Sequence, residues 1–209
     1  MNILFNMYKH LRTICIHKYY VGKYCFKFGL YKQGIFHDIS KFSPIEFWTS
    51  VKYYKGDISP IQAEKDEKGY SMAWAHHHNK NPHHWLYWVD FDKVNNITPM
   101  RIPYKYALEA IADWIGAGIT YYKNAGKKFT WDEPYEYYKT NTRLNSDKNI
   151  HYQTRQLWDT MLVDLKYIGI DYVQKQIYNK QYEKIYTDDG RIFDELNYKN
   201  LIKKYYWED

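Results

Sequence analysis

Apolar residues recur at spacings of three and four through the first thirty positions, which is the period of an amphipathic helix. The pattern predicts one long helix over residues 3–28, ending at Gly29. One position of the apolar stripe is polar, because His17 lies three residues after Ile14 and four before Val21. We therefore expect His17 to point toward the protein interior. His10 lies two turns earlier on nearly the same face.

The same helical period recurs later in the chain. It predicts helices over about 103–123 and over 151–169, and no series of alternating segments indicates a sheet. The predicted fold class is therefore all-α, a helical bundle. We expect short helices at the His37-Asp38 stretch and over 83–89 and 131–140, and a loop from Asp90 to Pro103.

Ser43-Pro44-Ile45-Glu46 has the composition of a helix start. Ser43 would be the N-cap and Pro44 the first helical residue, while Glu46 would be the reciprocal member of a capping box. The polar, Tyr- and Lys-rich tail after Asp171 predicts one or two helices, with a turn at residues 188–190.

A chain of 209 residues fits one domain. We expect residues 1–125 to form a helical core with the functional residues, and residues 126–209 to form a C-terminal helical extension packed on it. The two cysteines, Cys15 and Cys25, lie in one helical pattern and do not indicate a disulfide framework. A reducing cytoplasm is thus the expected location. The surplus of Tyr, Lys, Asn and Ile is typical of an AT-rich genome, such as that of a low-GC bacterium or a phage.

The formal net charge of +6 is spread along the chain. A mild basic excess fits an anionic substrate such as a nucleotide, and equally fits weak, non-specific binding of nucleic acid. No apolar run approaches the roughly 18–20 residues that a membrane span needs. The composition therefore argues against a membrane protein and leaves both kinds of anionic partner open.

His37-Asp38 places an imidazole beside a carboxylate, a mixed pair that Zn, Mn, Fe or Co accepts. Two residues do not make a metal site, so further ligands must come from elsewhere. His17 is one candidate, and Asp113 is another, because it lies in a helical pattern among small residues that let other groups approach it. Five histidines within nine residues complete the candidates: His76, His77, His78, His83 and His84.

The order His, His-Asp, His cluster, Asp resembles the HD superfamily of metal-dependent phosphohydrolases. His37-Asp38-Ile39-Ser40-Lys41 is similar to the His-Asp-Ile-Gly-Lys signature of many HD phosphodiesterases, with Ser40 in place of Gly. The chain also resembles, over residues 8–120, a bacterial and phage family of unassigned function that carries His-Asp-x-Ser-Lys-Phe and a His-His…His-His-Trp element.

The HD resemblance implies a helical bundle with a metal site between helices, holding one or two divalent ions (Mn, Fe, Co, Zn or Mg). The implied ligands are His17, His37, Asp38, His77, His83 and Asp113. His76 and His84 are close rivals to His77 and His83, and His10 is the reserve for His17. With two ions, Asp38 would bridge them.

The implied reaction is hydrolysis of a nucleotide phosphomonoester, or of a cyclic or oligonucleotide phosphodiester, by a metal-activated water. Asp38, Lys41 and His84 would be catalytic, and Lys41 and His76 would contact the phosphate. Trp74 and Tyr70 are candidates for stacking on a base.

Three alternatives remain open at the level of sequence. Some HD-fold proteins with a His-rich second metal site are di-iron oxygenases, and the same ligand pattern fits them. A non-enzymatic nucleic-acid-binding or partner-binding protein would explain the basic charge and the 20% aromatic content. A purely structural zinc site would explain the histidines and predicts unfolding on chelation.

Overall fold

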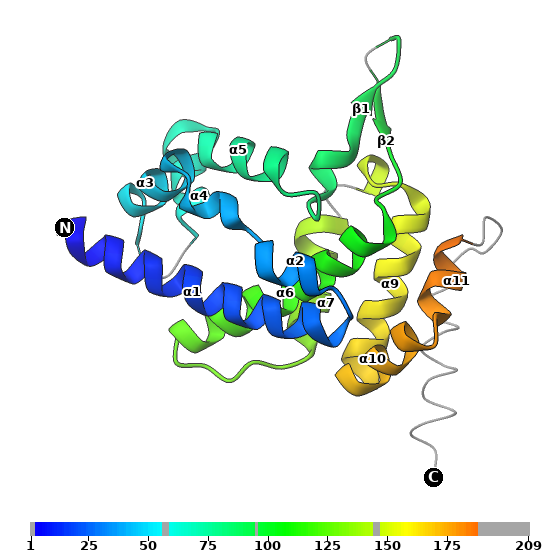
Figure 1. Ribbon diagram of the computed structural model, residues 1–209. Coiled ribbons are helices and arrows are strands. Elements are labelled where there is room, and N and C mark those ends of the chain that lie inside the picture. Colours follow the sequence, from blue (N-terminus) through cyan, green and yellow to red (C-terminus); the bar gives the residue numbers. More distant parts are fainter. Residues whose placement is uncertain (1–2, 56–58, 95, 144–146, 188–209) are drawn as a thin grey trace.

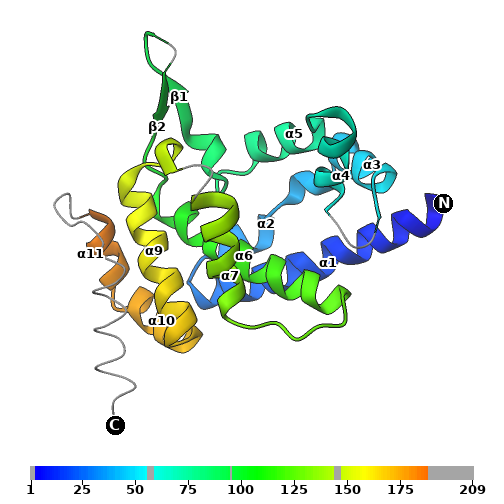
Figure 2. The same ribbon diagram turned by 180° about the vertical axis from the view of Figure 1, so that it is seen from behind.

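The computed structural model describes residues 3–55, 59–94, 96–143 and 147–187, and within these ranges the protein is an all-α bundle with a single small hairpin (Figure 1). The fold class predicted from the helical periodicity is confirmed. The two long helices α1 (Ile3–Lys27) and α6 (Tyr104–Asn124) lie side by side in both views of the molecule (Figures 1 and 2). The remaining elements are arranged around this pair of helices.

The other elements group around the two ends of this helix pair. Toward the N-terminal end of α1 lie α3, α4 and α5, while α9, α10 and α11 lie at the opposite end (Figure 1). The bounds of these and the connecting elements are α2 Tyr31–Phe36, η1 Ile39–Phe42, α3 Pro44–Lys52, α4 Pro60–Lys68, α5 Met72–Lys80, η2 Trp85–Trp88, β1 Val89–Phe91, β2 Ile97–Pro99, α7 Asp132–Tyr137, η3 Tyr138–Arg143, η4 Asp147–Asn149, α9 Tyr152–Tyr167, α10 Ile170–Tyr178 and α11 Gln181–Thr187.

Gly116 allows α1 and α6 to approach closely. A Cβ built at this glycine would lie 2.8 Å from the backbone nitrogen of Val21 and would also overlap the Val21 side chain. Val21 lies four residues after His17, and Gly116 three residues after Asp113, so the close crossing sits one turn from both polar residues. The small residues around Asp113 thus serve the close approach that the sequence predicted.

One apolar core contains residues from both predicted parts of the chain, 1–125 and 126–209. Val21 of α1, Ile111 and Ile115 of α6, and Leu157 and Trp158 of α9 are all fully buried in it. The indole Nε1 of Trp158 donates a hydrogen bond of 2.8 Å to the carbonyl oxygen of Ala107, which fixes α9 against α6. Burying an indole requires such a partner. α9 therefore completes the core against the first half of α6.

Three expectations about local structure are wrong. The predicted loop after Asp90 contains the antiparallel hairpin β1–β2, with Val89 opposite Pro99. Its strand side chains are mostly exposed, so they carry no apolar alternation that a sequence pattern could reveal. The turn is closed by the Asp92 carboxylate, which accepts hydrogen bonds from the backbone nitrogens of Val94 (2.8 Å) and Asn96 (2.9 Å).

The His37-Asp38 stretch is the second difference, because it is not a short helix. His37 ends α2, and Asp38 adopts a left-handed backbone with φ of 52° and ψ of 30° before the 3₁₀ turn η1 begins. Asp tolerates this conformation better than most residues. Likewise, the helix expected over 83–89 is only the 3₁₀ turn η2. The turn expected at residues 188–190 lies outside the described residues.

No helix in the described ranges is both long enough and apolar enough to cross a membrane.

Replacing Gly116 with alanine tests the helix crossing. The added methyl group meets the backbone of Val21, so α1 and α6 must separate, and we expect a loss of about 1–3 kcal/mol in the free energy of unfolding. Chemical denaturation measures it. Gly118→Ala is the matched control. The nearest atoms that its methyl group would meet belong to the side chains of Phe129 (2.9 Å) and Glu133 (3.9 Å) rather than to the backbone of another helix, and alanine has the higher helix propensity. Equal stability of the two variants would contradict the role of Gly116.

Candidate metal centre

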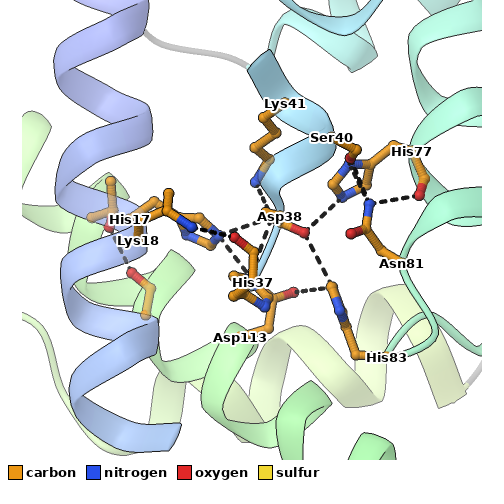
Figure 3. A network of polar contacts seen from close by, with 12 residues as sticks. His17, Lys18, His37, Asp38, Ser40, Lys41, His77, Asn81, His83 and Asp113 are labelled. Carbon is orange, nitrogen blue, oxygen red and sulfur yellow. Dashed lines mark hydrogen bonds and ion pairs between the residues drawn. The ribbon is translucent and has the colours of Figure 1, made fainter. Parts of the chain in front are cut away.

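Three parts of the chain bring the first group of potential ligands together. His17 comes from α1, His37 and Asp38 from the bend between α2 and η1, and Asp113 from α6 (Figure 3). The Nε2 atom of His17 lies 3.2 Å from both Asp38 Oδ2 and Asp113 Oδ1. The Nε2 atom of His37 lies 3.3 Å and 3.2 Å from the same two oxygens.

These four distances match a coordination polyhedron. Ligand atoms held about 2.0 Å from a zinc-sized ion in a tetrahedron lie about 3.3 Å from one another. Two imidazole nitrogens each face the same two carboxylate oxygens. A nitrogen that carries one proton can donate a hydrogen bond to only one of the two oxygens. A cation at the centre of the four atoms satisfies all of them at once. The first group is thus able to hold a metal ion.

A second group lies on the other side of Asp38. The Nε2 atoms of His77, from α5, and His83, from the segment after it, are each 3.5 Å from Asp38 Oδ1 (Figure 3). His84 completes the group, whose ligand atoms all lie within 4.8 Å of one another. Asp38 Oδ1, His83 Nε2 and His84 Nε2 are buried without any hydrogen-bond partner. Buried polar atoms without partners are costly, and a cation bound to this group could satisfy them.

Asp38 belongs to both groups. Its Oδ2 atom faces His17 and His37, while its Oδ1 atom faces His77 and His83. The carboxylate is almost completely buried, with 1% of its side chain exposed. Burial alone would raise its pKa, but the neighbouring His37 and Lys41 outweigh this effect and hold the pKa of Asp38 well below its usual range. Asp38 is therefore an anion aimed at two sites.

Glu109 fixes the orientation of two of the histidines. Its Oε1 atom lies 2.9 Å from His37 Nδ1 and 3.3 Å from His83 Nδ1. A proton on each Nδ1 satisfies Glu109 and leaves both Nε2 lone pairs facing Asp38. Carboxylates that hold the far nitrogen of a ligating histidine are the usual outer partners of metal sites. The three-residue group of His37, His83 and Glu109 is best explained in this way rather than as a further ion site.

Glu46 has the same relation to the His cluster. Its two oxygens lie 2.7 Å from His76 Nδ1 and 2.8 Å from His77 Nδ1. The predicted capping box is therefore only half correct: Ser43 Oγ accepts from the Glu46 backbone nitrogen at 3.4 Å, but the carboxylate turns inward to the histidines. Their need for a buried acceptor outweighs a surface capping bond.

Neither outer carboxylate was identified from the sequence. Glu109 had a readable signal, because it lies four residues before Asp113 and so occupies the same face of the helix. For Glu46 the sequence offered only the capping-box pattern, which does not indicate a carboxylate that faces histidines. Both are buried, with exposures of 5% and 4%.

The centre as a whole attracts positive charge. Burial lowers the pKa of His37, yet the adjacent carboxylates of Asp38, Asp113 and Glu109 raise it well above its ordinary value. The field that favours a proton there also favours a metal cation, and the two compete. His84 differs, because burial and the neighbouring His83 lower its pKa well below the ordinary value. It is a neutral imidazole with an available lone pair.

The structure places the other predicted residues at different positions around this centre. Lys41 Nζ lies 2.5 Å from Asp38 Oδ2. His84, which was predicted to be catalytic and was also a rival to His83 as a metal ligand, lies with the potential metal ligands of the second group. The ring of Trp74 packs against His84, with centroids 5.0 Å apart. Tyr70 is 58% exposed, and His10 packs against the Phe47 ring away from both groups.

A cleft of about 510 Å³ opens beside the metal centre. Asp38, His83 and Glu109 contribute to its lining, and so does His76, whose predicted contact with a substrate stays a prediction. The lining does not include Lys41, Trp74 or Tyr70, which were also predicted to contact the substrate. Its complete set of residues is Lys32, Gln33, Phe36, Asp38, Ile39, Ser40, His76, Lys80, Asn81, Pro82, His83, Lys105, Tyr106 and Glu109.

Removing the charge of Glu109 tests the outer carboxylate. In Glu109→Gln the amide is a weaker acceptor for His37 and His83, so we expect the affinity for Mn²⁺ or Zn²⁺ to fall about 10–100-fold. Competition with a chromogenic chelator measures it. Glu183→Gln, an exposed change of the same kind on α11, should leave metal affinity unaltered. Unchanged affinity in Glu109→Gln would argue against its orienting role.

The comparisons with known proteins concern this same region. The sequence model of a family of unknown function matches residues 6–164, which include every residue of the two ligand groups. No curated protein and no solved structure matches the chain. The match covers more than half of the sequence, and the chain belongs to this family of unknown function, DUF5662.

Proposed function

We propose that the protein is a metal-dependent phosphohydrolase that holds two divalent ions bridged by Asp38. The observation that carries the proposal is the position of the two Asp38 oxygens, each of which faces a separate set of imidazole nitrogens. A bridging carboxylate with nitrogen ligands on both sides is a typical arrangement for paired metal ions in hydrolases.

The proposed ligand sets follow from the two groups. His17, His37, Asp38 and Asp113 would hold the first ion, and Asp38, His77, His83 and His84 the second. Mixed imidazole and carboxylate ligands suit Mn, Fe, Co or Zn better than Mg, which prefers oxygen.

The charge balance also favours two ions. Four buried carboxylates (Asp38, Glu46, Glu109 and Asp113) surround the centre, while Lys41 is the lysine that pairs with one of them. Buried charges need compensation, either by protonated histidines or by metal ions. Two divalent ions would supply this compensating positive charge and would leave the histidine Nε2 atoms unprotonated and able to ligate.

When bound, such ions polarise a phosphoryl oxygen and lower the pKa of a bound water toward neutrality. The residues of the chain would do the rest. Asp38, His83 and Glu109 line the cleft and so open the centre to a substrate. Lys41, beside Asp38, adds a positive charge at the reacting end. His76 also lines the cleft, and its Nδ1 is held by Glu46, so that its Nε2 is available to contact a phosphate oxygen.

The substrate class proposed is a nucleotide. The cleft volume of about 510 Å³ lies in the usual range for small-molecule sites. The proposal retains the resemblance to the HD superfamily, which rests on the order of His17, His37-Asp38, the His cluster and Asp113. The spatial convergence of these residues on Asp38 supports that resemblance.

A di-iron oxygenase is the second candidate. The second ligand group favours it, because three of its four members are histidines, which suit iron. Iron as the purified metal, together with iron-dependent oxygen uptake, would move the proposal to this reaction.

Hydrolysis of p-nitrophenyl phosphate and of bis(p-nitrophenyl) phosphate by the metal-loaded protein tests the main proposal. In Asp38→Ala both ligand groups lose their shared member, so we expect kcat/KM to fall by at least about 10³-fold. Asp90→Ala, the same change at an exposed position of the hairpin, serves as the control. Circular dichroism establishes that both variants are folded. Full turnover by folded Asp38→Ala would refute the proposal.

A further inference from the structure

The cleft beside the metal centre carries more positive charge than a single phosphate requires. Lys32 of α2, Lys80 at the end of α5 and Lys105 at the start of α6 all contribute to its lining. They come from three separate elements, so no local helix pattern explains why they surround the same cavity.

In the part of the chain that the structure describes, none of these three lysines has an acidic partner. Among the described residues, the lysines that form ion pairs are others: Lys27, Lys41, Lys68, Lys139 and Lys166. The two carboxylates in the cleft lining, Asp38 and Glu109, are already engaged with Lys41 and with the histidines. The uncompensated charge of the cleft is therefore entirely positive.

We propose that the substrate is a nucleotide with two phosphate groups, one placed at the metal centre and the other held by Lys32, Lys80 and Lys105. This inference rests on the proposed function, because that function places the first phosphate. The metal ions and Lys41 supply the positive charge at the first position. The ammonium groups of the three remaining lysines act as point charges, which suit a second phosphate.

The rest of the lining fits the body of such a nucleotide. Phe36 is 57% exposed and Tyr106 is half-buried, so each offers part of a ring to a base or sugar in the cleft. Gln33, Ser40 and Asn81 add neutral hydrogen-bonding groups. Pockets for nucleotide-sized ligands combine apolar walls with a few polar groups in this way. Phe36 and Tyr106 would make the stacking contacts with a base that were predicted for Trp74 and Tyr70.

The test compares ligands that share one base and differ in phosphates. The metal-loaded protein is titrated calorimetrically with AMP, ADP and adenosine 3′,5′-bisphosphate. We expect ADP or the bisphosphate to bind at least about tenfold more tightly than AMP, which corresponds to two exposed charge contacts. If a ligand is cleaved during titration, the ratio of kcat/KM values replaces the ratio of affinities.

A triple variant, Lys32→Gln, Lys80→Gln and Lys105→Gln, should reduce this preference to about twofold or less. A second triple variant at exposed lysines away from the cleft, Lys148→Gln, Lys175→Gln and Lys184→Gln, removes the same net charge and should retain the preference. Equal affinity for the three ligands, no binding of any, or a preference that survives the first triple variant would each overturn the inference.

The two proposals fail separately. Metal-dependent hydrolysis of p-nitrophenyl phosphate without any preference for a second phosphate would overturn the inference and leave the proposed function in place. A preference for two phosphates, abolished in the first triple variant but without hydrolysis of any substrate, would support the lysine site and contradict the hydrolase.

Discussion

The buried carboxylate of Asp38 is the interaction on which the rest of the structure depends. An anion so fully removed from water is stable only among compensating cations or donors, and four histidines and Lys41 converge on it. Its left-handed backbone separates α2 from η1 at this point. The close helix crossing at Gly116 brings α1 and α6 together, so that His17 Nε2 lies 3.2 Å from Asp113 Oδ1. The fold brings distant segments to one carboxylate.

A second layer of carboxylates makes this arrangement directional. Glu109 faces the Nδ1 atoms of His37 and His83, and Glu46 faces that of His77, so each ring turns its Nε2 atom toward Asp38. A histidine with a fixed tautomer and orientation is a better ligand than a freely rotating one. The centre is thus prepared for cations by residues that need not touch them, and the cleft beside it is lined by lysines rather than by further acids.

Sequence patterns predicted the parts of this account that depend on helical period. The buried position of His17 in α1, the long helix around Asp113 and the all-α class all follow from apolar spacing, and the structure confirms them. In the first turns of α1 the apolar spacing was misleading, because Leu4 and Leu11 are exposed while Asn6 and His10 are buried. What the patterns missed depends on contacts between distant segments. Glu46 looked like a capping residue, and Glu109 looked like an ordinary helix glutamate, because their histidine partners lie 26 to 72 residues away. The exposed hairpin had no apolar alternation to reveal it.

Metal content is the measurement that tests the central claim most directly. The protein would be purified without a His tag, incubated with Mn²⁺ or Zn²⁺, freed of loosely bound ions and analysed by plasma mass spectrometry. If Asp38 bridges two ions, we expect two metal equivalents per chain in the native protein and loss of both in folded Asp38→Ala. A native protein that binds no metal, or an Asp38→Ala variant that keeps both equivalents, would contradict the account.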